Sequence, residues 1–187
     1  MNIYIRKAKP LDAAAVVPLI IEAIGNIAEQ MTGEHDSDAV EHEMIALFKR
    51  EDNRHSYLTT VVAERDGLVA GVMVLYSGKR AIELDMNLVN WLCQKTGENI
   101  VIPPEAHSDE YYIDTVSVHS KFRGQGIGTK LLIHAEKVAQ KAGFSKLSLN
   151  VEVEKEKAIR LYERVGYRVA EPWTIYGGDF QHMVKKL

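Results

Sequence analysis

The hydrophobic pattern divides the first half of the chain into helical and β-type segments. Residues 3–6 alternate like an edge strand, whereas residues 12–31 repeat apolar positions at helical spacing. Residues 37–50 form a second, more polar helical pattern. Two β-type runs, residues 57–63 and 69–76, are joined by an Asp-Gly turn, which is typical of a hairpin. This half therefore predicts helices beside an antiparallel pair of strands.

The second half alternates strand and helix. Residues 111–118 and 144–151 have β-type patterns, and amphipathic helical patterns follow at residues 126–143 and 154–165. The tail, residues 173–187, is typical of a hairpin. Together these patterns predict one α/β domain across all 187 residues, of the α+β mixed-sheet type. We expect a mostly antiparallel central sheet with a local parallel pair and flanking helices.

Residues 78–108 are harder to interpret. Apolar positions between residues 82 and 92 predict an amphipathic helix, and Pro103-Pro104 predicts an extended loop after it. Two interpretations stay open for this insertion. It lies beside a substrate site, or it packs as a surface helix on the sheet or on another subunit.

Composition narrows the class of protein. The chain is 46% apolar, with a net charge of −3 and a pI of about 6.2, which argues against broad nucleic-acid binding. The single cysteine, Cys93, excludes an internal disulfide, and the seven histidines show no ligand-pair spacing, so we expect no metal site. Without a signal-peptide pattern or a membrane-length apolar run, the expected location is cytoplasmic, with no membrane partner.

Three glycines at alternate positions form the most informative pattern. They stand between the β-type run 111–118 and an amphipathic helix, beside the basic residues Lys121, Arg123 and Lys130. Glycine lets backbone amides approach a ligand closely, and the start of a helix presents unpaired N–H groups and a positive dipole end. The junction therefore predicts a site for a diphosphate.

Two common phosphate-binding loops do not fit this junction. A dinucleotide fingerprint requires a third glycine where Thr129 stands. A P-loop requires Gly-Lys-Ser/Thr, whereas the order here is Gly128-Thr129-Lys130. A nucleotide-binding protein is thus a weaker alternative.

The run from Arg123 to Gly128, Arg-Gly-Gln-Gly-Ile-Gly, resembles the Arg/Gln-x-x-Gly-x-Gly/Ala signature of GNAT-type N-acetyltransferases. Residues 158–167, Ala-Ile-Arg-Leu-Tyr-Glu-Arg-Val-Gly-Tyr, resemble the closing element of the same family. The resemblance covers residues 111–170. It implies a GNAT-like acyl-CoA N-acyltransferase fold that moves acetyl from acetyl-CoA to a primary amine by direct attack in a ternary complex.

The resemblance also implies where the cofactor binds. The signature strand and the next strand would splay apart around the pantetheine arm, with a backbone N–H near Val118 on the acetyl oxygen. The implied contacts are the backbone of Val116, Ser117 and Val118, the pyrophosphate cradle of Arg123, Gly124, Gln125, Gly126, Ile127, Gly128 and Thr129, and Asn150 on the neighbouring strand.

Two residues take the implied catalytic roles. Tyr162 matches the family's general acid, although its helical spacing also suits a core aromatic residue. Asp114 lies where many members carry an acidic residue, and Glu110 precedes it on the same face; both also suit an ordinary solvated strand end. Glu29 and Glu34 are further candidates for the base.

Several alternatives stay open. Lys155 replaces an asparagine that is common in the family, and it would meet a coenzyme phosphate or simply be solvated. A non-catalytic CoA-binding sensor or interaction module of the same fold is the rival function, and another acyl-CoA donor is a further variant. The acceptor, a small-molecule or peptide amine, is not defined by any motif. The insertion and the tail hairpin are the candidate homodimer contacts.

Overall fold

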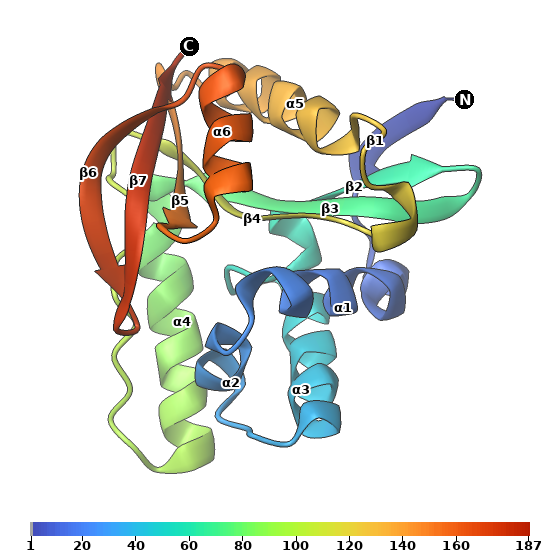
Figure 1. Cartoon of the computed structure of the whole chain (residues 1–187). Coiled ribbons are helices and arrows are strands. Elements are labelled where there is room, and N and C mark those ends of the chain that lie inside the picture. Colours follow the sequence, from blue (N-terminus) through green and yellow to red (C-terminus); the bar gives the residue numbers. More distant parts are fainter. Residues whose placement is uncertain (1) are drawn as a thin grey trace.

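A seven-stranded sheet separates two layers of helices in the computed structural model, which describes residues 2–187 (Figure 1). The strand order is β1-β2-β3-β4-β5-β7-β6. The strands are β1 Ile3–Lys7, β2 Thr60–Arg65, β3 Leu68–Ser77, β4 Tyr111–Val118, β5 Lys146–Glu152, β6 Arg168–Ile175 and β7 Gly178–Lys186. The helices are α1 Ala13–Ile24, α2 Ile27–Thr32, α3 Ser37–Lys49, α4 Gly78–Thr96, α5 Ile127–Lys141 and α6 Glu156–Arg164.

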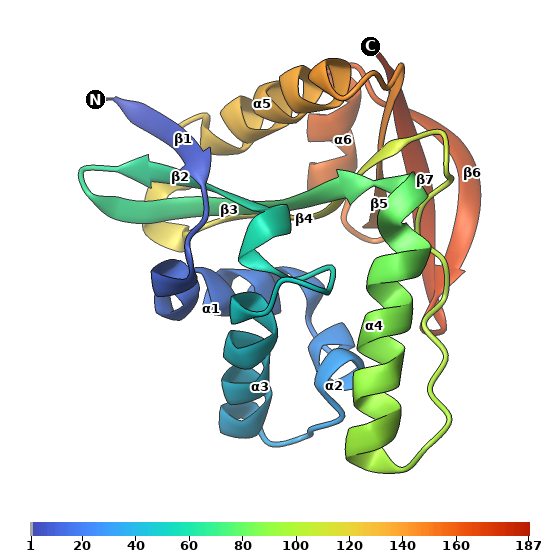
Figure 2. The same ribbon diagram turned by 180° about the vertical axis from the view of Figure 1, so that it is seen from behind.

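Each face of the sheet has its own core. Helices α1 to α4 cover one face, where Val62, Val72 and Tyr76 are buried. Helices α5 and α6 cover the other face, where Ala63 and Met73 are buried (Figure 2). Because side chains alternate across a strand, the central strands β2 and β3 need apolar residues on both faces, which explains their nearly continuous apolar runs.

Strands β4 and β5 form the only parallel pair among the described residues, and they stay paired over only three residues. Tyr111–Ile113 pairs with Leu147–Leu149. A bulge on β4 follows, because Val74 faces Thr115 and Leu75 faces Ile113, which leaves Asp114 as the extra residue. From there β5 pairs only with β7, so one backbone edge of β4 is open toward β5.

The predicted architecture is confirmed, with one helix broken and one hairpin longer than expected. The helix predicted at residues 12–31 is two helices, because Gly25 adopts φ 56° and ψ −130°, outside the helical region. The apolar periodicity continues through this break, so the pattern alone did not show it. The tail hairpin begins at Arg168 rather than at residue 173, and residues 57–59 form a short 3-10 turn before β2.

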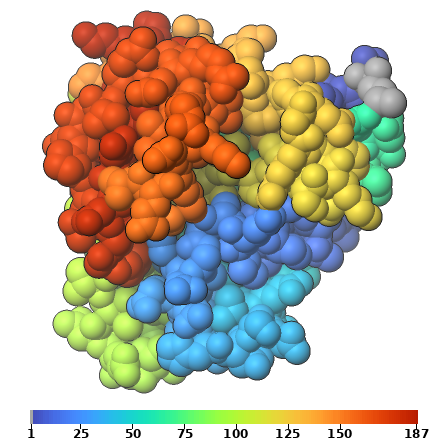
Figure 3. All heavy atoms as spheres, viewed as in Figure 1, coloured from blue at the N-terminus to red at the C-terminus, as the bar shows by residue number. Residues whose placement is uncertain are grey.

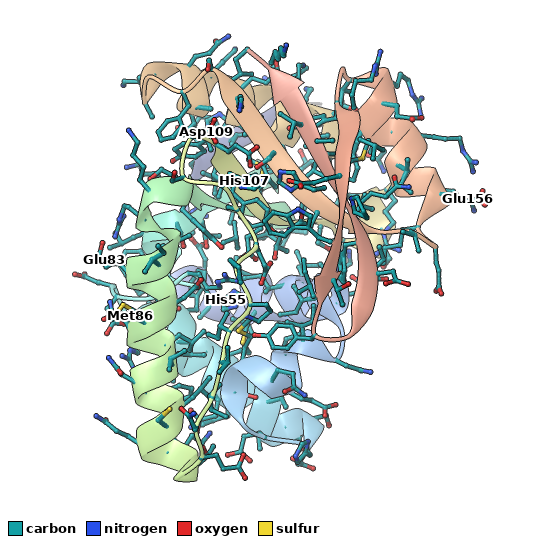
Figure 4. The ribbon with its side chains drawn as sticks, turned by 90° about the vertical axis from the view of Figure 1, so that its left-hand side faces the viewer. His55, Glu83, Met86, His107, Asp109 and Glu156 are labelled. Atoms are coloured by element: carbon teal, nitrogen blue, oxygen red, sulfur yellow. The ribbon has the colours of Figure 1, made fainter. Side chains whose placement is uncertain are left out.

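The insertion packs within its own chain. Leu84, Leu88 and Leu92 of α4 are buried in the core with α1 to α3. The loop after α4, which carries His107 and Asp109, runs back beside the helix to β4 (Figure 4). Of the helices in residues 2–187, none combines the length and apolar character needed to cross a membrane.

Candidate active site

The open edge of β4 forms one wall of a cleft of about 330 Å³. Residues 114–118 of β4 and 149–152 of β5 line it, and the end of α1 closes it below. Figure 3 shows this hollow where the segments coloured yellow, orange and blue meet. The splay that follows the Asp114 bulge therefore creates the cleft.

A larger groove of about 1130 Å³ adjoins the cleft at the start of α5. Its lining includes Arg123, Gly124 and residues 126–129 on one side, and basic side chains of α6 on the other. The Gln125 side chain instead donates to the Lys121 carbonyl, 3.4 Å away, and does not line the groove. The basic residues of α6 and its start that join the lining are Lys155, Lys157, Arg160 and Arg164. Glu154 and Glu156 also line the groove, but the cations outnumber them, so the arrangement suits an anionic ligand.

The glycines of the loop have different physical roles. Gly124 and Gly126 have φ of 75° and 77°, the left-handed region that other residues adopt at a cost. A Cβ on either would meet nothing within 4 Å, so the requirement is conformational. Gly128 lies inside α5, where a Cβ would approach only Val118, at 3.8 Å. It leaves space for a ligand at the first turn.

Two basic side chains at the edge of the cleft pair with carboxylates of neighbouring elements. Arg123 donates from Nη2 to Oε1 of Glu22 on α1 at 2.6 Å, and from Nε to the Val118 carbonyl at 2.9 Å. Lys155 donates to Oε1 of Glu152 at 3.1 Å. Both cations line the cleft as well as the groove. An anion bound at their junction would therefore compete with Glu22 and Glu152.

Tyr162 of α6 lines the cleft. Its ring packs edge-on against Tyr167, with centroids 5.9 Å apart. Burial raises the pKa of its hydroxyl to about 12. The phenol therefore stays protonated at neutral pH and is available as a hydrogen-bond donor, and it also serves as a packing residue.

Asp114 lines the cleft, and neighbouring polar side chains hold its carboxylate in place. Oδ2 accepts from the Tyr76 hydroxyl at 2.9 Å, and Oδ1 accepts from Oγ1 of Thr115 at 2.9 Å. Nη1 of Arg54 lies 3.5 Å from Oδ2. Asp114 lies two residues after Tyr112 and so shares its side of the strand, toward the α1–α4 layer, where its carboxylate is buried and held by these contacts.

Glu105 is a cleft residue that sequence reasoning missed. It comes from the loop after α4, yet it is buried, and Oε1 accepts from Nη1 of Arg54 at 2.5 Å. Oε2 accepts from the Tyr112 hydroxyl at 3.0 Å. Burial is the main reason that its pKa is raised, and the negative charge of Asp114 adds to it. No local pattern marked this residue, because its partner Arg54 is 51 positions away.

Asn150 lies in the cleft wall, but its amide is used inside the protein. Nδ2 donates to the Glu105 carbonyl at 2.9 Å and approaches the Tyr112 hydroxyl at 3.2 Å. Oδ1 lies 2.7 Å from Nδ1 of His182. The Asn150 side chain therefore fixes the walls of the cleft, and its backbone is what remains available to a ligand.

The other carboxylates considered as bases lie outside the cleft. Glu110 contacts Nε2 of the buried His182 at 3.0 Å, and this contact holds the pKa of Glu110 low. Glu29 pairs with His35 and Glu34 with Lys95. None of the three lines the cleft.

Three side chains of the metal-ligand type meet at another corner. Atoms of His107, Glu171 and His182 lie within 4.8 Å of one another. Both ring nitrogens of His182 already have hydrogen-bond partners, and the Trp173 ring stacks on it at 4.8 Å. With those bonds in place, His182 has no nitrogen free for a metal ion. Hydrogen bonds and ring stacking therefore explain why these three side chains lie close together.

Known proteins share this arrangement of elements. A sequence model of the acetyltransferase (GNAT) family matches residues 21–167. N-alpha-acetyltransferase 50 of Danio rerio is 36% identical over 61 residues, which are 32% of this chain and 36% of that protein, so the match spans about a third of the relative.

Two solved structures cover nearly the whole chain. One acetyltransferase structure shares 29% identity and a TM-score of 0.79 over 98% of both chains. An N-acetyltransferase from Staphylococcus aureus Mu50 shares 26% identity and a TM-score of 0.79 over 97% of this chain and 99% of that one. The family match spans well over half of the sequence, and the mixed sheet agrees with both structures. The chain therefore belongs to the GNAT family of acetyltransferases.

Proposed function

We propose that this protein transfers an acetyl group from acetyl-CoA to a primary amine by direct attack in a ternary complex. One observation carries the proposal: the cleft beside β4 is continuous with the glycine-lined groove at α5. Val118, Arg123, Lys155 and Ala158 line both spaces. A long ligand with a diphosphate at one end and a thioester at the other would fit this path.

The donor's charged part is assigned to the groove. The N–H groups of the first turn of α5 have no partner within the helix, and the helix dipole favours an anion there. The pyrophosphate would lie on residues 123–129, with Lys155, Lys157 and Arg160 supplying further positive charge.

The donor's thioester end is assigned to the cleft. The pantetheine amides would pair with the open backbone edge of Val116, Ser117 and Val118, opposite the backbone of Asn150. An N–H near Val118 would meet the acetyl oxygen, where negative charge develops during attack.

Two side chains of the protein would then assist the proton transfers of the reaction. The amine nitrogen attacks the thioester carbon, the C–N bond forms and the C–S bond breaks. Tyr162 would donate a hydrogen bond to the departing sulfur. With a pKa of about 12 against about 8.5 for a thiol, full proton transfer is uphill by roughly 5 kcal/mol, so this help is modest. Asp114 is the carboxylate of β4 that would assist removal of the amine's proton; since its side chain is only 4% exposed, it would act through a water molecule or through its negative charge.

The acceptor class is a small-molecule or peptide amine. The Danio rerio relative is named an N-alpha-acetyltransferase, which supports an amine acceptor without defining it. The test is amine-dependent release of free thiol from acetyl-CoA across a panel of alkylamines, amino acids and peptides. Turnover with at least one amine is expected. Tight acetyl-CoA binding without turnover on any of them would instead favour a non-catalytic CoA-binding module.

A further inference from the structure

The position of Glu105 is fixed from three sides although it lies in a loop. Arg54 and the Tyr112 hydroxyl each hold one carboxylate oxygen, and Asn150 holds the backbone carbonyl. These partners come from the segment after α3, from β4 and from β5. A loop residue fastened in this way has the positional accuracy that a site for substrate requires.

Negative charge is in excess around Glu105. Three carboxylates, those of Asp85, Glu105 and Asp114, lie around the single buried guanidinium of Arg54. One guanidinium cannot neutralise three carboxylates, and burial makes the remaining charge costly. The pKa values of Asp85 and Glu105 are accordingly raised. The ionisable groups that face Glu105 are Arg54, Tyr76, Tyr112, Asp114 and Tyr176.

Of the three carboxylates, Glu105 is the one accessible from the cleft. Asp85 does not line it. Asp114 does, but its side chain is only 4% exposed, against 11% for Glu105. An approaching cation would therefore meet Glu105 first, and Asp114 would act behind it through its charge.

We propose that Glu105 receives the ammonium group of the acceptor and takes its proton, so that the acceptor is a cationic alkylamine; this inference rests on the proposed acetyl transfer. The ammonium gives one proton to the Glu105 carboxylate. The neutral nitrogen then forms the C–N bond as the C–S bond breaks, and its second surplus proton goes to the thiolate. Glu105 returns its proton to water after the product leaves.

The test compares Glu105→Gln with Glu98→Gln, an exposed glutamate in the same loop. Benzylamine, which is cationic at neutral pH, and aniline, which is neutral, serve as acceptors of similar shape. For benzylamine, Glu105→Gln is expected to lower kcat/KM by about 100-fold or more and to remove the acid limb of its pH profile. For aniline the change should stay within about threefold, since no proton has to be removed first. Glu98→Gln should match the wild-type protein with both amines.

A glutamine at position 105 can still accept from Arg54, so the fold is expected to survive, which unchanged acetyl-CoA binding would check. Glu105→Asp, which keeps the charge, should recover part of the benzylamine rate. A Glu105→Gln rate with benzylamine within threefold of wild type overturns the inference.

A second readout separates this inference from the proposed function. Benzylamine is titrated into the CoA-bound protein and followed by NMR. If wild-type protein binds benzylamine, Glu105→Gln does not, and no amine is acetylated, then the cation site stands and acetyl transfer fails. If benzylamine does not bind to the wild-type protein, the Glu105 inference is wrong, whatever the transferase activity.

Discussion

Gly126 is the residue whose backbone conformation the proposed donor site is expected to depend on most. Its φ of 77° is left-handed, and a β-branched residue there would rotate the amides that precede α5. Gly126→Val is expected to raise the Kd for acetyl-CoA at least about tenfold in calorimetry.

The matched control is Gly143→Val just after the C-terminal end of α5, where φ is 80° and a Cβ also meets nothing within 4 Å. This variant carries the same kind of strain far from the groove, so it should lose stability but keep its affinity for acetyl-CoA. Equal Kd values for Gly126→Val and the wild-type protein would contradict the donor site.

Tyr162 is expected to help catalysis without being essential. Because the pKa of its hydroxyl is about 12, it serves as a hydrogen-bond donor rather than a full acid at neutral pH. Tyr162→Phe should lower kcat about three- to tenfold and leave the Kd for acetyl-CoA unchanged. An undiminished kcat would leave Tyr162 with only its packing role.

At the residue scale, the sequence predicted the groups that belong to local motifs. The three glycines of the loop, Asp114 and Tyr162 line the two connected spaces, and their roles there stay predictions. Arg54 and Glu105 were not predicted, because neither lies in a periodic segment and their contact forms only when distant parts of the chain fold together.

At the level of elements, Gly78 connects the start of α4 to the residues directly before β4. The Gly78 amide donates to the Glu110 carbonyl at 2.8 Å, and a Cβ at Gly78 would overlap the His107 carbonyl oxygen. Gly78→Ala is expected to lower the free energy of unfolding by about 1–3 kcal/mol in urea titrations, and to lower kcat by shifting the loop that carries Glu105.

The control for Gly78→Ala is Gly97→Ala at the other end of α4, where a Cβ meets nothing within 4 Å. Its φ of 74° costs about 1 kcal/mol in stability, but activity should be unchanged. Equal activity in Gly78→Ala and the wild-type protein would show that the loop tolerates this displacement.

The contact between α1 and the phosphate loop is expected to oppose donor binding. Glu22 occupies the Arg123 guanidinium at 2.6 Å, and this half-exposed pair contributes little stability. Glu22→Gln should lower the Kd for acetyl-CoA about two- to fivefold, because a negative charge beside the diphosphate is removed. The gain should shrink in high salt. A weaker affinity in the variant would contradict this geometry.

At the scale of elements, β4 was predicted with its observed bounds, and the start of α5 was predicted to within a residue. The β4 bulge was not predicted, since a strand pattern does not reveal which residue lacks a partner. That bulge opens the cleft.

For the molecule as a whole, the free energy of unfolding should depend on pH through one buried histidine, His55. His55 is fully buried and has no hydrogen-bond partner on either ring nitrogen within residues 2–187. Burial lowers its pKa to about 4 in the folded state, against about 6.5 when unfolded.

Below about pH 6.5, His55 therefore binds a proton in the unfolded chain but stays neutral in the folded chain. Stability is fully present above that pH and falls by on the order of 3 kcal/mol as the pH drops toward 4. His55→Leu should flatten this part of the curve of urea midpoints against pH. His42→Leu, on the exposed side of α3, should keep the wild-type slope, and identical slopes in all three proteins would exclude His55 as the cause.

The sequence by itself determined the class of fold, the glycine loop at the start of α5 and the helix that carries Tyr162. Each of these depends on neighbours along the chain, through side-chain periodicity and backbone conformation. Only the tertiary structure decided the break at Gly25, the splay of β4 from β5 and the carboxylates around Arg54. These features depend on strand pairing and on contacts between distant residues, and the low-dielectric interior that alters their proton affinity exists only once the two helical layers close on the sheet.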